Sequence, residues 1–140
     1  LMDLACDTLG DEELKKQFAE MDLKISHNIQ NIALDNGALN NERENDKIDK
    51  KRVWWVEAES VVGFINAYQH SGEKKFLESA RSVWEYIKAE MIDKREGSEW
   101  YAEVSYDHKP HDWKEIVGPW KCPYHNGRMC MEVINRGVDF

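Results

Sequence analysis

Two helical segments joined by a Ser-Gly turn occupy residues 54–91, "WWVEAESVVGFINAYQHSGEKKFLESARSVWEYIKAEM". Each segment has apolar residues three or four positions apart along one face. These residues are Ala58, Val61, Val62, Ile65 and Tyr68 in residues 54–70, and Phe76, Ala80, Val83, Trp84 and Ile87 in residues 73–91. This spacing is typical of amphipathic helices. The stretch therefore predicts two helices packed together as an α-hairpin.

A second unit of the same kind precedes this stretch. Residues 11–34 carry apolar side chains at helical spacing, and residues 1–9 begin with such spacing already under way. Gly10 and Gly72 occupy corresponding turns, and one more helix is expected after Asn126. Repeated helix pairs predict stacked α-hairpins, either in a solenoid or in a closed toroid whose long loops surround one cavity. We therefore predict an all-α fold.

Two long, turn-rich connections separate the helical segments, at residues 35–52 and 93–113. Both contain short alternating stretches that predict β-hairpins at the ends of the helices. Both are longer than the usual loop between helices, and long loops in compact domains are often functional. The basic run Lys50, Lys51 and Arg52 lies in the first connection, where we expect a solvated turn.

The composition argues against several kinds of partner. The chain has 140 residues and a formal net charge of -8, which disfavours nucleic-acid binding because phosphates are bound by clustered Lys and Arg. No apolar run is long enough to cross a membrane and no leader segment is recognisable, so we expect a cytoplasmic protein without a membrane partner. Because apolar helical spacing is under way at Leu1, we expect a fragment that starts inside a helix.

The cysteines do not indicate a site, whereas the tryptophans suggest a binding surface. Cys6, Cys122 and Cys130 are odd in number and lack paired CxxC spacing, so we expect reduced thiols, without a disulfide framework or a structural zinc site. Six tryptophans, in contrast, are more than a helical domain of this size needs. Clustered aromatic side chains in a polar chain suggest a surface that stacks a flat, amphipathic ligand.

Much of the chemistry lies in "GPWKCPYHNGRMCMEV", residues 118–133. His125 is close to the start of the last helix, and an imidazole titrates near neutrality, as proton transfer requires. The alternative is a loop histidine that only caps the helix. Upstream, Trp55 and Glu59 share one helix face, which suits stacking of a sugar ring and binding of its hydroxyls. The alternative there is a core tryptophan and a glutamate that favours the helix N-terminus.

Four other histidines have positions that favour structural roles. His27 lies in the middle of a helix, His70 lies beside the Ser71-Gly72 turn, and His108 and His111 flank a proline in a polar loop. The sequence contains no glycine-rich phosphate loop and no nucleophile elbow. At this point His125 is the histidine for which a catalytic role stays open beside the capping role.

Residues 54–93 and 118–133 closely resemble the C-terminal part of cellobiose 2-epimerases, in the N-acylglucosamine 2-epimerase superfamily. The stretches "DNGALNNE" and "DKREGSEWYAEV" also resemble hairpins of that family. The resemblance implies that residues 1–140 are the C-terminal part of one (α/α)6 toroid domain with short β-hairpins in its long loops. It also implies an enzyme that reversibly inverts C2 of the reducing-end glucose in a β-1,4-linked disaccharide, with no metal or other cofactor.

The same resemblance implies roles for individual residues. In the family, the sugar ring opens, one histidine removes the C2 proton to leave an enediolate, and a second histidine returns a proton to the opposite face. His125 matches one of that pair, Trp55 and Trp120 match carbohydrate-stacking residues, and Glu59 matches a polar residue of the pocket. The family's other histidine lies in a His-x-x-Glu stretch upstream of Leu1, so we expect the chain alone to be inactive. Because helix faces made to pack on further hairpins would be exposed, we expect the chain either to self-associate or to be unstable alone.

Two other functions remain open at this point. One is a non-catalytic helical-repeat module whose concave face binds carbohydrate or protein. The other is a glycoside hydrolase on the same toroid, with Glu57 or Glu59 as its acid.

Overall fold

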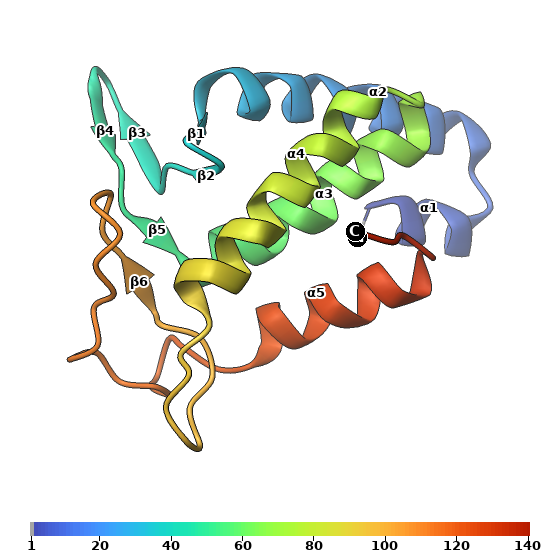
Figure 1. The fold of residues 1–140 in the computed structure, drawn as a ribbon. Coiled ribbons are helices and arrows are strands. Elements are labelled where there is room, and N and C mark those ends of the chain that lie inside the picture. Colours follow the sequence, from blue (N-terminus) through green and yellow to red (C-terminus); the bar gives the residue numbers. More distant parts are fainter. Residues whose placement is uncertain (1) are drawn as a thin grey trace.

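The computed structural model describes residues 2–140 and is mainly helical (Figure 1). The helices are α1 (Met2–Leu9), α2 (Glu12–Ile32), α3 (Trp54–Ser71), α4 (Lys74–Tyr86) with a π-helical turn η1 (Ile87–Met91), and α5 (Tyr124–Asn135). All the predicted helices are confirmed, and α4 ends earlier than expected because its last turn widens into η1. The expectation that the chain begins inside a helix concerns Leu1, which lies outside the described residues.

The core of the molecule is the α-hairpin of α3 and α4. On α4 the predicted apolar stripe is buried at Phe76, Ala80 and Val83, each with 0% of its surface exposed. On α3 the burial is wider than the stripe and includes Trp54, Glu57 and Phe64. The extra burial arises because α3 packs against α4, α5 and α2, so that several of its faces are covered. A helix surrounded in this way does not show a clear amphipathic pattern in its sequence.

The two α-hairpins share the same turn. Gly10 follows α1 with φ of 69° and donates its backbone N–H to the carbonyl of Cys6, while Gly72 follows α3 with φ of 73° and donates to Tyr68. Both glycines adopt the left-handed conformation that commonly ends a helix. The second helix of each unit is also followed by a hairpin, since Leu34–Asp35 pairs with Ala38–Leu39 and Ile92 bridges to Trp100. The predicted repeat is confirmed.

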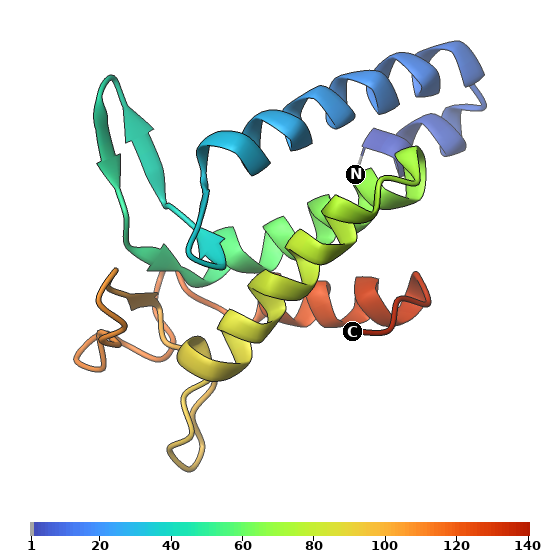
Figure 2. The same cartoon turned by 45° about the horizontal axis from the view of Figure 1, so that its top comes forward.

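The strands all lie at one end of the helices, as Figures 1 and 2 show from two directions. They are β1 (Leu34–Asp35), β2 (Ala38–Leu39), β3 (Glu42–Glu44), β4 (Lys47–Asp49), β5 (Arg52–Val53) and β6 (Glu103–Val104). β1 pairs with β2 and β3 with β4, both antiparallel, so the predicted hairpins are confirmed. The pairing of β5 with β6 joins the two long connections at the same end where α3 and α5 begin.

The prediction of a solvated basic turn at residues 50–52 is wrong for Arg52. Its side chain is 2% exposed and donates to Asn40 Oδ1 and to the carbonyl oxygen of Asp35, both at 2.7 Å. These acceptors compensate the guanidinium for the loss of water. Arg52 therefore fixes the β1–β2 hairpin to β5 directly before α3.

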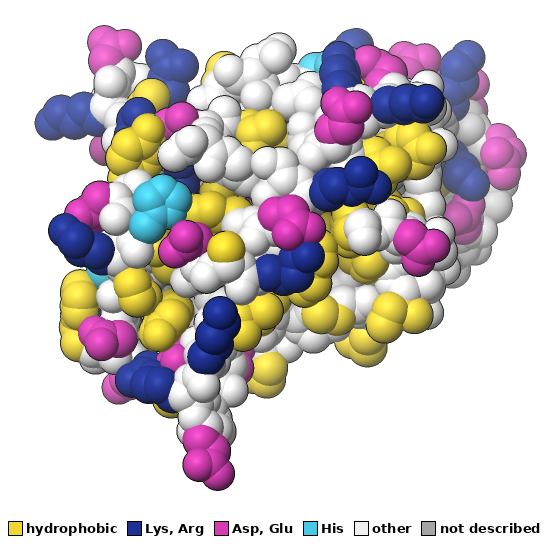
Figure 3. All heavy atoms as spheres, in the orientation of Figure 1, with side chains coloured by type: hydrophobic (Ala, Val, Ile, Leu, Met, Phe, Trp, Pro, Cys, Tyr) yellow, Lys and Arg dark blue, Asp and Glu magenta, His cyan; other side chains and the backbone are white. Residues whose placement is uncertain are grey.

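The last helix begins earlier than the sequence suggested. α5 starts at Tyr124, so His125 lies in its first turn and not in a preceding loop. One face of α5 packs on α3, while Met131 and Ile134 on its outer side are 61% and 76% exposed. Figure 3 shows hydrophobic side chains along the lower edge of the molecule, where α5 runs. Over the described residues, no helix is long and apolar enough to cross a membrane.

Candidate functional site

His125 lies among aromatic side chains where α5 and α3 both begin. Its ring centroid is 6.0 Å from that of Trp55, 6.5 Å from that of Trp54 and 5.0 Å from that of Tyr124. The rings of Trp54 and Tyr124 stand nearly perpendicular to the imidazole, at 77° and 80°. Edge-to-face packing of this kind restricts rotation of the enclosed ring. The position of His125 is therefore well defined before any ligand binds.

A carboxylate fixes the imidazole from one side. His125 Nδ1 lies 2.9 Å from Glu59 Oε1, and Arg128 Nη1 donates to Glu59 Oε2 at 2.6 Å. Because a carboxylate only accepts hydrogen bonds, this contact favours the tautomer of His125 with its proton on Nδ1, in which Nε2 is the nitrogen with a free lone pair. Arg128 lies one turn further along α5 and balances the charge of Glu59.

His125 faces an open hollow of about 560 Å³. The hollow is lined by Asn41, Lys51, Val53, Trp54, Trp55, Glu103, Trp120 and His125. Trp120 is 92% exposed at its rim. Apolar rings beside a few polar groups are typical of a site that binds a sugar, whose ring faces are apolar and whose edges carry hydroxyls.

The structure brings together all four predicted site residues, but their relation to the hollow differs. Trp55, Trp120 and His125 line it, whereas Glu59 lies behind His125 and lines the adjoining hollows between α2 and α3. The arrangement shows how Glu59 orients His125. Its predicted contact with substrate stays a prediction, as do the roles of the other three.

Glu57, the other acid considered for a hydrolase, lies away from the hollow. It is fully buried, and both of its carboxylate oxygens accept the backbone N–H of Leu39, at 3.1 and 3.0 Å. Burial raises the pKa of Glu57 to about 8, although Leu39 N–H and the charge of Arg52 lower it in part. Glu57 thus holds the β1–β2 hairpin against α3, a structural role.

The other histidines contact structural partners. His27 packs on Phe76, with its Nε2 3.2 Å from Glu73, and His108 packs on Tyr86. His111 stacks on Trp113 and lies 3.2 Å from Glu103, which lines the hollow. His70 lies at the end of α3. The contacts of His27, His108 and His111 are packing and ion-pair contacts, and that none of these four histidines is catalytic stays a prediction.

Cys6, Cys122 and Cys130 form no disulfide among the described residues. Cys6 is buried, whereas Cys122 and Cys130 are exposed. Among the side chains that the structure describes, no group of three or more His, Cys, Asp or Glu is arranged to hold a metal ion.

Sequence reasoning missed a second polar cluster next to His125. Glu99, in the hairpin that follows η1, accepts hydrogen bonds from Lys121 and from Asn126. Lys121 and Asn126 are 5% and 8% exposed. Glu99 is 22 positions from Lys121 and 27 from Asn126 in the sequence, so their spacing did not predict the contact. The only sequence feature that pointed toward it was the density of polar residues around His125.

The chain is similar to one protein family and to several individual proteins. The family model of N-acylglucosamine 2-epimerase (GlcNAc 2-epimerase) matches residues 15–127. The cellobiose 2-epimerase of Ruminococcus albus is 80% identical over 139 residues, which are 99% of this chain and 36% of that protein. The cellobiose 2-epimerase of Dictyoglomus turgidum is 45% identical over 136 residues, 97% of this chain and 35% of that protein.

Solved structures give the same result. The crystal structure of a sugar epimerase from a ruminal bacterium matches with a TM-score of 0.96 at 79% identity, over 99% of this chain and 36% of that one. Cellobiose 2-epimerase from Bacillus thermoamylovorans matches with a TM-score of 0.86 at 46% identity, over 94% of this chain and 34% of that one. These matches confirm the resemblance to cellobiose 2-epimerases and the predicted architecture of (α/α)6 toroid hairpins.

The chain spans only about a third of the length of these relatives. That residues 1–140 are the C-terminal part of a single toroid domain stays a prediction.

Proposed function

Since the chain belongs to the N-acylglucosamine 2-epimerase family, we propose that the full-length protein is a cellobiose 2-epimerase. It reversibly inverts C2 of the reducing-end glucose in cellobiose-like β-1,4 disaccharides. The 80% identity to the cellobiose 2-epimerase of Ruminococcus albus supports this substrate class. The observation that carries the proposal is His125, oriented by Glu59 and facing a hollow walled by tryptophans.

The chemistry requires a base at C2 of the open-chain sugar. A proton next to an aldehyde is far more acidic than an ordinary C–H proton, so a neutral imidazole can remove it if the developing oxyanion is stabilised. With Nδ1 bound to Glu59, the Nε2 atom of His125 is the one that takes or returns this proton. Trp55 and Trp120 stack on the sugar.

Inversion requires proton transfer on both faces of the planar enediolate. His125 serves one face, and a second histidine serves the other after rotation about C2–C3. Among the described residues, His125 is the only histidine that lines the hollow. We assign the second histidine to the full-length protein, so residues 1–140 alone do not complete the reaction.

Replacement of His125 by asparagine in the full-length protein tests the proposal. Asparagine keeps a similar shape but does not exchange a proton near neutral pH, so epimerisation of cellobiose falls by about 10²–10⁴-fold or more while binding changes only a few-fold. Exchange of the C2 proton with deuterated solvent is lost from the epimer whose proton faces His125. Deuterium incorporation at the wild-type rate from both epimers would show that His125 is structural.

The two alternatives are separated by the products. The epimerase converts cellobiose to glucosyl-mannose, a hydrolase releases free glucose, and a non-catalytic binding module leaves the sugar unchanged. The hydrolase lacks support, since Glu57 is buried against Leu39 and Glu59 is paired with His125 and Arg128.

A further inference from the structure

We propose that Glu99 is a positioning residue that controls both His125 and Trp120 through two separate contacts. One contact reaches the first turn of α5, which carries His125, and the other reaches the loop that carries Trp120. The inference rests on the proposed function, because it assigns consequences to the placement of these two residues.

The two oxygens of the Glu99 carboxylate bind different segments. Oε1 accepts from Lys121 Nζ, and Oε2 accepts from Asn126 Nδ2 at 2.6 Å. Lys121 directly follows Trp120, and Asn126 directly follows His125. The Glu99 carboxylate thus fixes both Lys121, in the loop before α5, and Asn126, in the first turn of α5.

Glu99 is itself held by a rigid hairpin. The Asp93 carboxylate accepts from Arg95 N–H at 3.0 Å and from Ser98 Oγ at 2.6 Å. The Asp93 N–H donates to the Glu99 carbonyl at 2.8 Å. The hydrogen bonds from Arg95 and Ser98 lower the pKa of Asp93 far below its ordinary value, so the carboxylate keeps its charge and the hairpin keeps its shape.

The contact with Asn126 is the one that acts on His125. Asn126 Oδ1 has no hydrogen-bond partner among the described residues, so the Nδ2 bond to Glu99 is what orients this side chain. Loss of that bond leaves either the buried amide of Asn126 or Oε2 of Glu99 without its partner, and it removes the link between the hairpin and the first turn of α5. The first turn then shifts, and with it the Nε2 atom of His125.

The contact with Lys121 acts on the loop. Lys121 Nζ also donates to the carbonyl of Ile116 at 2.7 Å, and the backbones of Gly118 and Lys121 exchange hydrogen bonds. The Lys121 side chain is only 6% exposed. A buried ammonium without its carboxylate is strongly unfavourable, so removal of Glu99 displaces the loop and Trp120.

The two contacts predict two kinetic signatures in the full-length protein. Asn126→Ala lowers kcat by about 10²-fold, since a 1 Å misplacement of a catalytic group has an effect of that size, and leaves KM within a few-fold. One of the two epimers loses its C2 proton to the second histidine and not to His125. With that epimer as substrate, Asn126→Ala exchanges the C2 proton with deuterated solvent faster than it epimerises the sugar. Lys121→Met instead raises KM about tenfold with exchange and epimerisation still coupled.

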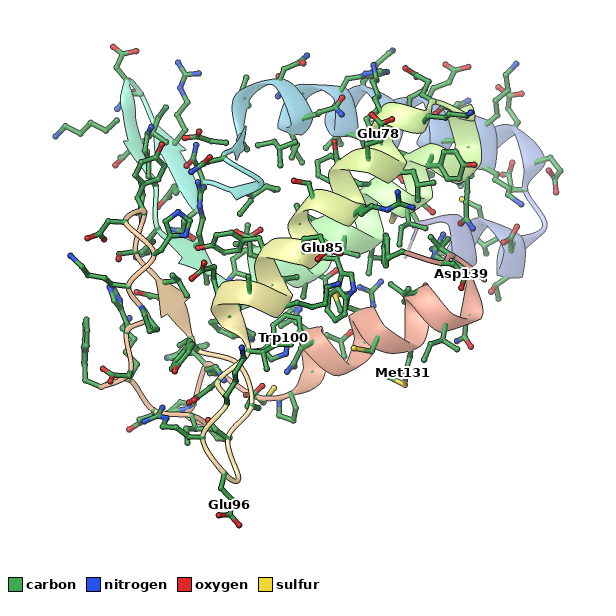
Figure 4. All side chains as sticks on the ribbon, in the orientation of Figure 1. Glu78, Glu85, Glu96, Trp100, Met131 and Asp139 are labelled. Atoms are coloured by element: carbon green, nitrogen blue, oxygen red, sulfur yellow. The ribbon has the colours of Figure 1, made fainter. Side chains whose placement is uncertain are left out.

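Conservative variants separate positioning from folding. Glu99→Gln retains an acceptor for Asn126 but no charge for Lys121, so its kinetics should resemble those of Lys121→Met. The double variant Glu99→Gln with Lys121→Met removes the unpaired charge and regains thermal stability. Glu96→Gln is the matched control, because Glu96 lies on the same hairpin and points into solvent (Figure 4). It behaves as wild type.

The outcomes distinguish this inference from the proposed function. If His125→Asn abolishes epimerisation while Asn126→Ala, Lys121→Met and Glu99→Gln all match the control, the positioning role is wrong and the function stands. The positioning role is also wrong if Asn126→Ala, at an unchanged melting temperature, loses exchange and epimerisation equally with both epimers as substrates. Retained activity in His125→Asn contradicts the proposed function itself.

Discussion

The two α-hairpins have the same sequence pattern and the same glycine turn, yet they are buried very differently. In the hairpin of α3 and α4, the apolar stripes form the core, and Ile65, Phe76 and Val83 are completely buried. In the hairpin of α1 and α2, the structure describes every residue of α2 and none of them is buried. An amphipathic pattern therefore specifies which face of a helix packs, while the neighbouring elements determine whether it does.

The exposed stripe of α2 shows what this difference leaves open. Met21 and Ile25 are 45% and 48% exposed, although Val83 and Ile87, at the corresponding positions of the second unit, are completely buried. Ile32, at the end of the same stripe, is 46% exposed. Contiguous exposed apolar surface is typical of a face that packs against another chain segment or another molecule. The predicted self-association of residues 1–140 stays a prediction and is consistent with this face.

The largest expected effect is a difference in the free energy of unfolding between matched substitutions in the two α-hairpins. In residues 1–140, Phe76→Ala removes a fully buried ring and should lower the free energy of unfolding by about 3–5 kcal/mol. The matched substitution Ile25→Ala, on a half-exposed side chain of α2, should cost less than about 1 kcal/mol. Urea denaturation of both variants measures the difference.

The same substitution, Ile25→Ala, in the full-length protein shows whether the exposed face of α2 is buried there. If the α2 face packs against further segments there, the cost of Ile25→Ala rises toward the 2–5 kcal/mol that is typical of a buried isoleucine. Similar costs for Phe76→Ala and Ile25→Ala in residues 1–140 would contradict the comparison.

The helices and the repeat could be predicted because they depend on local sequence. Apolar spacing defines each helix, and Gly10 and Gly72 mark the turns. The β1–β2 hairpin was predicted from the turn-rich, alternating stretch that begins at Asp35, and its turn residues Asn36 and Gly37 have φ of 55° and 87°. The pairing of β5 with β6 was not predictable, because it joins two polar connections far apart in the sequence.

The site was predictable only where its residues share a helix or a family motif. Trp55 and Glu59 lie on one face of α3, and His125 was recognised from its motif. The contact of Glu99 with Lys121 and Asn126 depends on the tertiary arrangement of three segments. The burial of Arg52 was missed for the same reason, since its acceptors come from the β1–β2 hairpin.

A change of intermediate size is expected at Glu57, which joins the two units by fixing the β1–β2 hairpin to α3. Its pKa in the folded state is about 8 and its ordinary value is 4.5, so the folded protein keeps a proton that the unfolded chain loses. This contribution to stability is complete below about pH 4.5 and is lost as pH rises through about 8, by up to about 1.4 kcal/mol for each pH unit.

The variant Glu57→Gln tests this pH dependence. Glutamine is neutral at every pH and still accepts the Leu39 N–H, so its stability should decline less than that of wild type between pH 5 and 8 in urea denaturation. Glu78→Gln, at an exposed position of α4, is the control and should follow the wild-type curve. Parallel curves for wild type and Glu57→Gln would show that Glu57 is ionised in the folded protein.

The smallest effect concerns the turn glycines, where the two units are most alike. An added Cβ meets nothing within 4 Å at Gly10 or at Gly72, so the cost of alanine at either position comes from its left-handed φ alone, about 1–2 kcal/mol. Gly63→Ala is the matched control, because Gly63 lies inside α3 without a positive φ and with equal space, and alanine there should be neutral or stabilising by up to about 1 kcal/mol.

The two turn variants should differ in which amides they expose. Since α2 has no buried residue, Gly10→Ala should accelerate hydrogen exchange in α1 and α2 alone, whereas Gly72→Ala should accelerate it throughout the α3–α4 core and α5. If Gly10→Ala accelerates exchange in α3 as much as in α2, the two hairpins unfold as one unit, and the difference in burial does not divide the molecule.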